Sequence, residues 1–388
     1  MMAGERMRGA FEPFIGFYAK HKISPVRQDI SDIGKHYSRR DYLYRYLGIS
    51  PLAVRSRSVI EFGPGSGHNA LFTTSLGPSR YVLVDANPTG LEQSKDLLCQ
   101  YYPEATCHAF VESRIQDFDT DERFSLVLCE GVIPQQDHPA AFARHVGKFV
   151  EPGGILVVTT ADYVSYFAEV LRRILGASLV DHEAPIEKQL DVLRPIFASH
   201  LKTLPGMSRP VDDWILDNIL NPWNENLFSI EDAITALSEE FDVYGASPRF
   251  LTDWRWYKDI FDGRQRLNER AIEAYRGNLL MFLDCRVEAP IVDRRRSETV
   301  WNICRDTYGV MVDFQEHRNM ARLEEVAECC HRSAAILDRG MPQTAAALRE
   351  AEAYFRRPAG RDPAACFDSF RSFFGRAQQY LSFIKRYR

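Results

Sequence analysis

Five short apolar runs alternate with helix-like segments between residues 58 and 162, and this alternation strongly constrains the fold. The runs are contained in SVIEF, RYVLVDANP, ATCHAFVES, FSLVLCEGVIP and GILVVTTAD. They are mostly continuous rather than alternating, which is typical of parallel strands buried on both faces. Glycine or proline ends the helix-like segments between them. We therefore predict an α/β fold with a doubly wound, mostly parallel sheet.

The rest of the chain predicts additions to that core. Residues 1–50 are rich in aromatic residues and predict a helical N-terminal cap, which either lies over a ligand or only packs. The core spans 51–165 and returns at 229–262, where FDVYGASPRF predicts a sixth strand. Residues 166–228 predict a helical insert acting as a substrate lid. Residues 263–388 predict a C-terminal helical domain, because apolar residues recur at helical spacing in AACFDSFRSFFGRAQQYLSFI.

Polar and glycine residues predict where two of the helices begin and end. Ser38 is a candidate N-cap for a helix that Gly48 ends. Ser229 is a candidate N-cap for the helix in IEDAITALSEE, with Asp232 at its third position.

Composition narrows the classes of protein that the chain can belong to. The 388 residues are 45% hydrophobic and 26% charged, as in ordinary soluble proteins, and the net charge of −5 argues against a nucleic-acid partner. The eight cysteines form no CxxC pair, which favours reduced thiols over a disulfide framework or a metal site. The sequence shows no signal peptide and no apolar run of about 18 residues, so we expect a cytoplasmic protein without membrane attachment.

The stretch VIEFGPGSGHNA, residues 59–70, joins the first predicted strand to the first helix and suits a nucleotide. Glycines let a ligand approach the backbone, and a helix N-terminus offers free N–H groups. A P-loop requires lysine and Ser/Thr after its last glycine, but His68 and Asn69 follow Gly67. The dinucleotide fingerprint is G-x-G-x-x-G, whereas Gly63, Gly65 and Gly67 form G-x-G-x-G.

Two acidic residues refine the choice of ligand. Glu61 stands two residues before the first glycine, where it would repel a pyrophosphate and attract a cation. Asp85 ends the second run, where an acid can accept hydrogen bonds from both ribose hydroxyls of NAD or of S-adenosylmethionine. S-adenosylmethionine carries a sulfonium, an ammonium and no phosphate, so it fits this pattern better than a phosphate ligand does.

The ordered set VIEFGPGSGH, YVLVDANP, ESRIQDF, FSLVLCEGVIPQ and VEPGGILVVTT resembles the class I S-adenosylmethionine-dependent methyltransferases, over residues 55–165 and more weakly over 230–260. The resemblance implies a Rossmann-like fold, with S-adenosylmethionine as cofactor and S-adenosylhomocysteine as product. It implies that Glu61, Gly63 and Gly65 face the methionine part and the ribose, and that Asp85 binds the ribose diol. The other cofactor residues that it implies are Gly67, Ala86, Arg114, Ile115, Glu130 and Gly131. Arg114 stands where many members have an acid that meets the adenine, which leaves that contact to the Ile115 backbone.

The same resemblance implies an enzyme of class EC 2.1.1 that moves a methyl group to an oxygen or nitrogen of a small molecule. Such a protein mainly positions the acceptor for in-line displacement and excludes water. Members that modify DNA amines carry N/D-P-P-[YFW] after strand four, whereas this chain has EGVIPQ, so base methylation is not expected. The alternative is a non-catalytic or regulatory protein that kept the fold for binding S-adenosylmethionine or another nucleotide.

The acceptor side is less defined by the sequence. Candidate catalytic residues are His68, His138 and Tyr163, and each has an ordinary structural interpretation, such as a helix cap. Candidate acceptor-binding residues are Gln135, Trp254, Trp256 and Tyr257, with Trp214 and Trp223 adding to the aromatic supply. These aromatics either wall a pocket for an aromatic, lipidic or sugar-like acceptor or pack the insert onto the core. We further expect a homodimer contact through the C-terminal helices.

Overall fold

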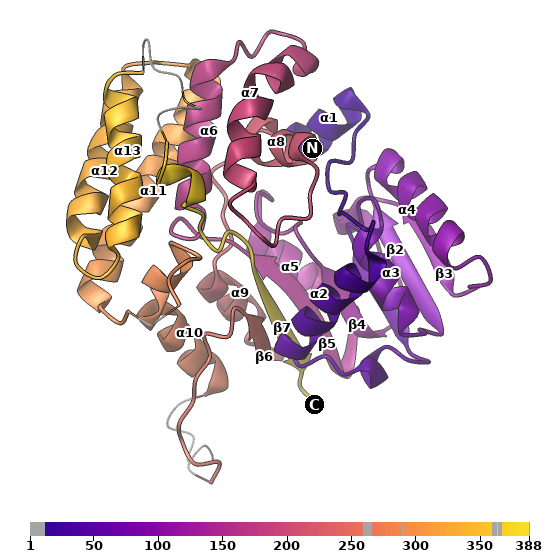
Figure 1. The fold of residues 1–388 in the computed structure, drawn as a ribbon. Helices are drawn as coiled ribbons and strands as arrows, with labels where there is room; N and C mark the ends of the chain where they lie inside the picture. The colour runs from indigo at the N-terminus through magenta and orange to yellow at the C-terminus, as the bar shows by residue number, and fades with distance from the viewer. Residues whose placement is uncertain (1–11, 259–265, 289–290, 359–362, 364–366, 388) are drawn as a thin grey trace, which may run out of the picture. The chain divides into compact units, whose positions relative to one another are not determined.

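The computed structural model describes residues 12–258, 266–288, 291–358, 363 and 367–387, and the chain forms two compact units (Figure 1). The sheet unit comprises Met1–Ala161, Asn226–Tyr275 and Gln378–Arg388. The helical unit comprises Asp162–Glu225 and Arg276–Ala377. The chain therefore passes between the two units four times.

The sheet unit is built on a seven-stranded sheet with the order β3-β2-β1-β4-β5-β7-β6. β1 to β5 pair in parallel, and β7 pairs antiparallel to both β5 and β6. This confirms the predicted doubly wound, mostly parallel fold. The strands are β1 (Ser58–Phe62), β2 (Arg80–Asp85), β3 (His108–Glu112), β4 (Phe124–Cys129), β5 (Val150–Thr160), β6 (Phe241–Ser247) and β7 (Gln379–Lys385).

Helices cover the sheet, and the N-terminal region belongs to the core. Tyr44 of α2 and Phe72 of α3 lie in one buried cluster with Tyr81 and Leu83 of β2. A second aromatic cluster joins Phe62 to Phe118 and Phe149. The helices of this unit are α1 (Glu12–His21), α2 (Ile33–Tyr46), α3 (His68–Ser75), α4 (Pro88–Tyr101), α5 (Pro139–Gly147), α9 (Ile230–Leu237) and the start of α10 (Leu267–Gly277).

The two local helix signals have different outcomes. The capping box of Ser229 and Asp232 is confirmed at the start of α9. Ser38 is not an N-cap, because α2 begins earlier, at Asp32, whose side chain accepts from the Lys35 backbone N–H. The end of α2 agrees with the prediction, since Gly48 has a φ of +69°.

The predicted helix at the C-terminus is wrong, because Gln379–Lys385 forms β7. Leu381 and Phe383 are fully buried between β5 and β6. The Ser382 hydroxyl also donates to the Leu47 carbonyl at 2.6 Å. Pairing with two strands far away in sequence therefore overrides the helical spacing of the local apolar residues.

The helical unit combines the predicted insert with most of the predicted C-terminal domain, so these two segments do not form separate bodies. The predicted boundary at residue 263 lies outside the described residues. The main helices of the unit are α6 (Phe167–Leu179), α7 (Ile186–Leu201), α8 (Val211–Ile215), η3 (Leu216–Leu220), η5 (Leu279–Phe282), α11 (Arg294–His317), α12 (Arg322–Leu337), α13 (Pro342–Arg356) and η6 (Phe370–Ser372).

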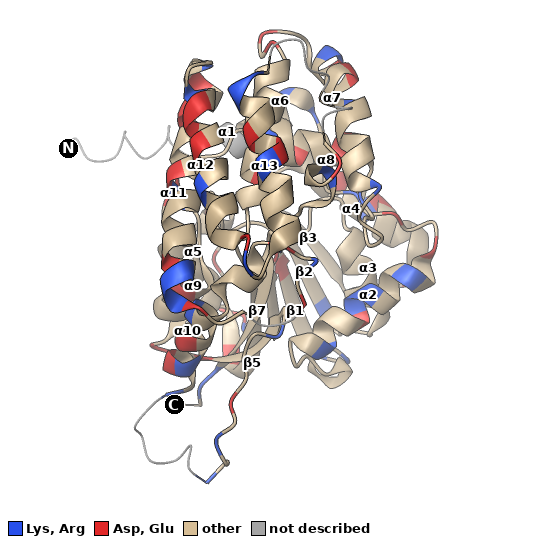
Figure 2. Ribbon diagram, turned by 60° about the vertical axis from the view of Figure 1, so that its left-hand side comes forward, with Lys and Arg blue, Asp and Glu red and all other residues tan. Residues whose placement is uncertain are grey.

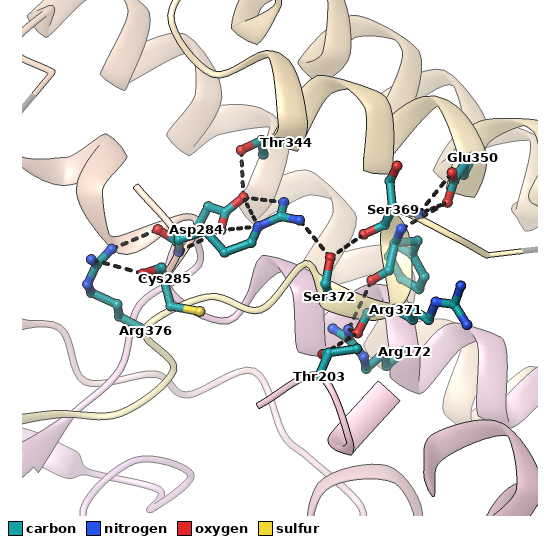
Figure 3. Close-up of polar contacts among 12 residues, drawn as sticks. Arg172, Thr203, Asp284, Cys285, Thr344, Glu350, Ser369, Arg371, Ser372 and Arg376 are labelled. Carbon is teal, nitrogen blue, oxygen red and sulfur yellow. Dashed lines mark hydrogen bonds and ion pairs between the residues drawn. The ribbon is translucent and has the colours of Figure 1, made fainter. Parts of the chain in front are cut away.

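Polar contacts fasten the segment that leaves the helical unit for β7 (Figure 3). The Glu350 carboxylate accepts from the backbone N–H groups of Asp368, Ser369 and Phe370 at 2.9 to 3.1 Å. Arg376 donates to the carbonyl oxygens of Asp284 and Cys285, at 2.8 and 3.3 Å. These contacts fix the segment through side chains, because little of it is regular secondary structure.

Charged side chains gather on the helices, whereas the strands are mainly uncharged (Figure 2). This distribution fits a sheet that helices cover on both faces. Among the described residues, no helix has the length and apolar content needed to cross a bilayer. The described residues also contain no group of three or more His, Cys, Asp and Glu side chains that could hold a metal ion.

Candidate functional site

Three neighbouring strands end side by side and bring the predicted cofactor residues together. Phe62 of β1 pairs with Val84 of β2 and with Cys129 of β4. The residues that follow Phe62, Val84 and Cys129 are Gly63, Asp85 and Glu130, so these three lie next to one another. The order of connection also reverses between β1 and β4, and ligands of open α/β sheets bind at such a switch point.

The glycine loop adopts a backbone that side chains would disturb. Gly63, Gly65 and Gly67 have φ values of +72°, +54° and +77°. A Cβ atom on Gly65 would lie 2.4 Å from the Val26 side chain, and one on Gly67 would lie 2.8 Å from the Cα of Ser94. Gly67 is also the N-cap of α3, so the first N–H groups of that helix follow the loop directly.

Asp85 links β2 to the glycine loop. Its carboxylate accepts from the backbone N–H of Gly65 at 3.0 Å and from that of Asn87 at 2.8 Å. Burial raises the pKa of Asp85 to about 6. The two carboxylate oxygens together have about four acceptor positions, so these two bonds leave acceptor capacity for a ribose hydroxyl. This geometry fits the ribose role that the sequence predicts.

Glu61 is buried in β1 rather than exposed to solvent. It is only 4% exposed, and the Tyr81 hydroxyl donates to its carboxylate. Burial, with the nearby charge of Glu130, raises the pKa of Glu61 to about 7. A cation bound above the loop would favour the ionised form of this group.

The sequence did not reveal Arg40 of α2 as part of this site. Its guanidinium binds the Glu130 carboxylate with two hydrogen bonds of 2.8 and 2.7 Å. Both side chains are more than 90% buried. Nothing in the local sequence distinguishes Arg40 from its neighbour Arg39, and only the packing of α2 against the sheet selects one of them.

Residues 23–26, which we call the strap, lie against the glycine loop. The Asn87 amide donates to the Ile23 carbonyl at 3.1 Å, and Ser24 is buried. Val26 is the side chain that a Cβ on Gly65 would strike. Of the two roles open for the N-terminal region, these contacts favour a cover over the loop.

The remaining cofactor candidates flank the same strand ends. The Ser113 N–H donates to the Asp85 carbonyl, which places the end of β3 beside β2 and next to Arg114. Ile115 is buried in a short 3₁₀ helix, and its carbonyl pairs with the His145 side chain at 2.8 Å. Two further candidates, half-buried Ala86 and exposed Gly131, directly follow Asp85 and Glu130, and the Gly131 N–H donates to the Thr159 hydroxyl at 2.7 Å.

Two of the three catalytic candidates have a structural role in the folded chain. His68 begins α3, and its Nδ1 pairs with the Ser66 hydroxyl at 2.9 Å. His138 is the N-cap residue of α5 but makes no side-chain capping bond. Tyr163 belongs to the helical unit, where its ring packs 5.4 Å from those of Trp301 and Tyr308. A catalytic role for any of them stays a prediction.

The aromatic candidates do not gather at the glycine loop. Trp254, Trp256 and Tyr257 follow the edge strand β6 and are 92%, 59% and 69% exposed, which does not fit the wall of a closed pocket. Trp214 and Trp223 are buried in the helical unit, where Trp214 packs on Phe197 and Trp223 on Tyr166. Both rings therefore pack within the helical unit.

Gln135, the other acceptor candidate, lies on the connection after β4. It has a φ of +74°, and its backbone N–H donates to the Asn226 carbonyl at 2.9 Å. Its neighbour Gln136, which the sequence did not single out, is buried and donates to the Val132 carbonyl at 2.8 Å. Hydrogen bonds of both glutamines therefore shape the connection beside Glu130.

Comparisons with known proteins point in the same direction as the geometry. Residues 35–187 match a family described as a methyltransferase domain. The chain is 27% identical, over 177 residues, to the mitochondrial ubiquinone biosynthesis O-methyltransferase of Dictyostelium discoideum, which covers 43% of this chain and 53% of that protein. A ubiquinone biosynthesis O-methyltransferase of Rickettsia bellii is 25% identical over 145 residues, 37% of this chain and 52% of its own. The chain thus spans about half the length of the curated relatives it matches.

Solved structures give weaker similarities. PKMT2 of Rickettsia typhi has a TM-score of 0.43 and 15% identity, over 62% of this chain and 49% of its own. Magnesium protoporphyrin IX methyltransferase of Synechocystis, with bound S-adenosylhomocysteine, has a TM-score of 0.36 and 14% identity, over 63% of this chain and 90% of its own.

The matched segment contains the features that the site requires. It begins inside α2, includes the glycine loop and Asp85, and ends beyond β5. Residues 35–187 therefore match a methyltransferase domain, and they contain the motifs that resemble the class I S-adenosylmethionine-dependent methyltransferases.

Proposed function

We propose that the protein is an enzyme that moves a methyl group from S-adenosylmethionine to an oxygen or nitrogen atom of a small molecule. The observation that carries this proposal is the set of acids around the loop, with Glu61, Asp85 and Glu130 at three adjacent strand ends. Such a site suits a ligand that is cationic and free of phosphate. S-adenosylhomocysteine would be the product.

The protein's own residues would act mainly by binding and orientation. When bound, S-adenosylmethionine supplies an activated methyl group. Asp85 would accept hydrogen bonds from the ribose hydroxyls, which sets the depth of the ligand along the strand ends. The buried carboxylates would complement the positive methionine end, and the strap would exclude water from the loop.

An oxygen atom is the first acceptor type to test, because the curated relatives are O-methyltransferases. Their similarity covers less than half of this chain, so the acceptor molecule itself is a separate question. A hydroxyl acceptor also needs a general base, for which His68 and His138 are the candidates in the sheet unit.

Calorimetry with S-adenosylmethionine, S-adenosylhomocysteine and NADH tests the cofactor. We expect the first two to bind and NADH not to bind. Binding of NADH alone would refute the methyltransferase proposal. Transfer of labelled methyl groups to a panel of hydroxylated and amine acceptors then tests activity. Cofactor binding without transfer to any acceptor would favour the non-catalytic alternative.

A further inference from the structure

A buried ion pair connects α2 to the end of β4. Both terminal nitrogens of Arg40 donate hydrogen bonds to the Glu130 carboxylate, at 2.8 and 2.7 Å. The side chains are only 7% and 8% exposed. This two-point geometry fixes the direction of the carboxylate, because the guanidinium fork matches both oxygens.

The fixed carboxylate lies beside the glycine loop. Glu130 follows Cys129, the partner of Phe62, so it stands next to Gly63 across the sheet. Asn69, two residues after the last loop glycine, has its amide nitrogen 3.5 Å from the same carboxylate. Adjacent strands are about 4.8 Å apart, so the Glu130 backbone lies within a few ångströms of the loop backbone.

Stability alone gives a weak reason for such a pair. Desolvation of two buried charges often offsets their attraction, and apolar residues of similar size can replace them at little cost. The Glu61 carboxyl lies nearby, and the charge of Glu130 contributes to its raised pKa. An ion pair buried at this electrostatic cost therefore calls for a functional explanation.

We propose that Arg40 is a positioning residue for the cofactor, which directs the Glu130 carboxylate beside the glycine loop, where it contacts the cationic methionine end of S-adenosylmethionine. This inference rests on the proposed function. It assigns α2 a part in selecting the sulfonium over the neutral thioether of the product. Removal of Arg40 should act through the loss of this fixed direction of the Glu130 carboxylate.

Ionisable side chains surround this pair. Those that interact electrostatically with Arg40 or Glu130 are Tyr44 of α2, Glu61 of β1, Cys129 of β4 and Tyr380 of β7. The nearby Glu61 and Asp85 titrate near neutral pH. The test therefore compares all variants at one pH above both values.

The experiment measures the affinities of S-adenosylmethionine and S-adenosylhomocysteine by calorimetry at pH 8. The variants are Arg40→Met, Glu130→Gln, the double variant and Arg40→Lys. Arg45→Met is the matched control, because Arg45 lies on the same helix in an exposed ion pair with Asp41. Thermal unfolding checks that each variant is folded, and the double variant removes the risk of an unpaired buried charge.

We expect Arg40→Met to weaken S-adenosylmethionine binding about tenfold, which is about 1.4 kcal/mol, and to weaken product binding less. Glu130→Gln should show a loss of similar size, and the double variant should match it. Arg40→Lys should restore part of the affinity, since lysine keeps the charge but not the fork.

Two results would overturn the inference. One is an Arg40→Met protein whose affinity for S-adenosylmethionine and whose cofactor-to-product ratio match those of Arg45→Met. The other is an Arg40→Met loss that persists at full size in the Glu130→Gln background, which would mean that Arg40 acts independently of Glu130. Failure of the proposed function looks different, because the wild type itself would then not bind S-adenosylmethionine.

Discussion

Single residues at the strand ends combine binding chemistry with unfavourable burial. Asp85 and Glu61 are acids in an environment that favours their neutral forms, and burial raises both pKa values, to about 6 and about 7. Such perturbed acids are typical of functional sites, where the ligand rather than the fold stabilises the charge. Substitution of each acid therefore separates its role in binding from its effect on stability.

Replacement of Asp85 tests the ribose assignment. Asp85→Ala removes the acceptor for the ribose hydroxyls and the two backbone bonds to Gly65 and Asn87. We expect calorimetry to show no cofactor binding, while circular dichroism shows a folded protein. The exposed Asp96→Ala is the control and should bind normally. Unchanged affinity in Asp85→Ala would show that the ribose assignment is wrong.

Replacement of Glu61 tests the electrostatic cost of the site. Its pKa is about 7 in the folded protein against 4.5 ordinarily, so the native state binds more protons than the unfolded state between these values. Stability therefore falls as pH rises through this window. Glu61→Gln should raise the urea midpoint of the ligand-free protein at pH 8, by the equivalent of about 1 to 3 kcal/mol, and by less at pH 5.

The same substitution should weaken S-adenosylmethionine binding, because the neutral amide no longer attracts the sulfonium. Glu92→Gln on the exposed face of α4 is the control for both measurements and should change neither. A Glu61→Gln protein that is less stable than the wild type at pH 8 would contradict the prediction.

At the scale of elements, the glycine loop and the strap behave as one packed unit. Gly65 has a φ of +54°, and its missing side chain makes room for Val26. Gly77 has a φ of +75°, but a Cβ atom added to it would meet no neighbour within 4 Å. Alanine substitutions at the two glycines therefore distinguish the cost of backbone strain, which both share, from the cost of a clash with the strap, which only Gly65 has.

Gly77→Ala should cost about 1 to 2 kcal/mol, from the left-handed backbone alone. Gly65→Ala should cost more in thermal unfolding and should also weaken cofactor binding, because it displaces the strap. Val26→Ala in the Gly65→Ala background should recover part of the stability by relieving the clash. Equal losses for Gly65→Ala and Gly77→Ala would show that the strap does not pack on the loop.

At the scale of the whole molecule, the last described strand along the chain lies inside the sheet rather than at its edge. β7 is the final strand, yet it pairs with both β5 and β6 and is the only described partner of β6 in the sheet. Segments of the helical unit thus separate β5, β6 and β7 along the chain, and all three strands belong to the sheet unit.

Truncation after residue 377 should prevent folding of the sheet unit, although the missing residues belong to a short terminal segment. It removes the fully buried Leu381 and Phe383, and loss of each such side chain costs several kcal/mol against a total stability of about 5 to 15 kcal/mol. Solubility and circular dichroism measure the outcome. Removal of Tyr387 and Arg388 alone is the control, because Tyr387 is largely exposed. A folded protein that ends at residue 377 would contradict this account of the sheet.

Local sequence predicted the parts of the site that depend on local chemistry. The positive φ values of Gly63, Gly65 and Gly67 follow from one pentapeptide, and Asp85 is found by its place at the end of an apolar run. Ser229 and Asp232 form their capping box within four residues. In each case the partners are close in sequence, so the pattern contains the whole interaction.

The missed features all join distant segments. Arg40 meets Glu130 ninety residues away, and the strap meets a loop about forty residues further on. The C-terminal apolar pattern fits a helix by spacing, and only the gap between β5 and β6 makes it a strand. The exposed Trp254 and Trp256 show the same limit, because aromatic content does not say which side chains are buried.

The sequence by itself determined the class of fold, the conformation of the glycine loop and the kind of ligand that the loop suits. These depend on apolar periodicity, on glycine's freedom at positive φ and on the charge of nearby acids, all of which act over a few residues. The tertiary structure decided which arginine enters the site, what covers the loop and which strand completes the sheet. Burial and pairing between distant segments decide these features, and no short stretch of sequence contains both partners.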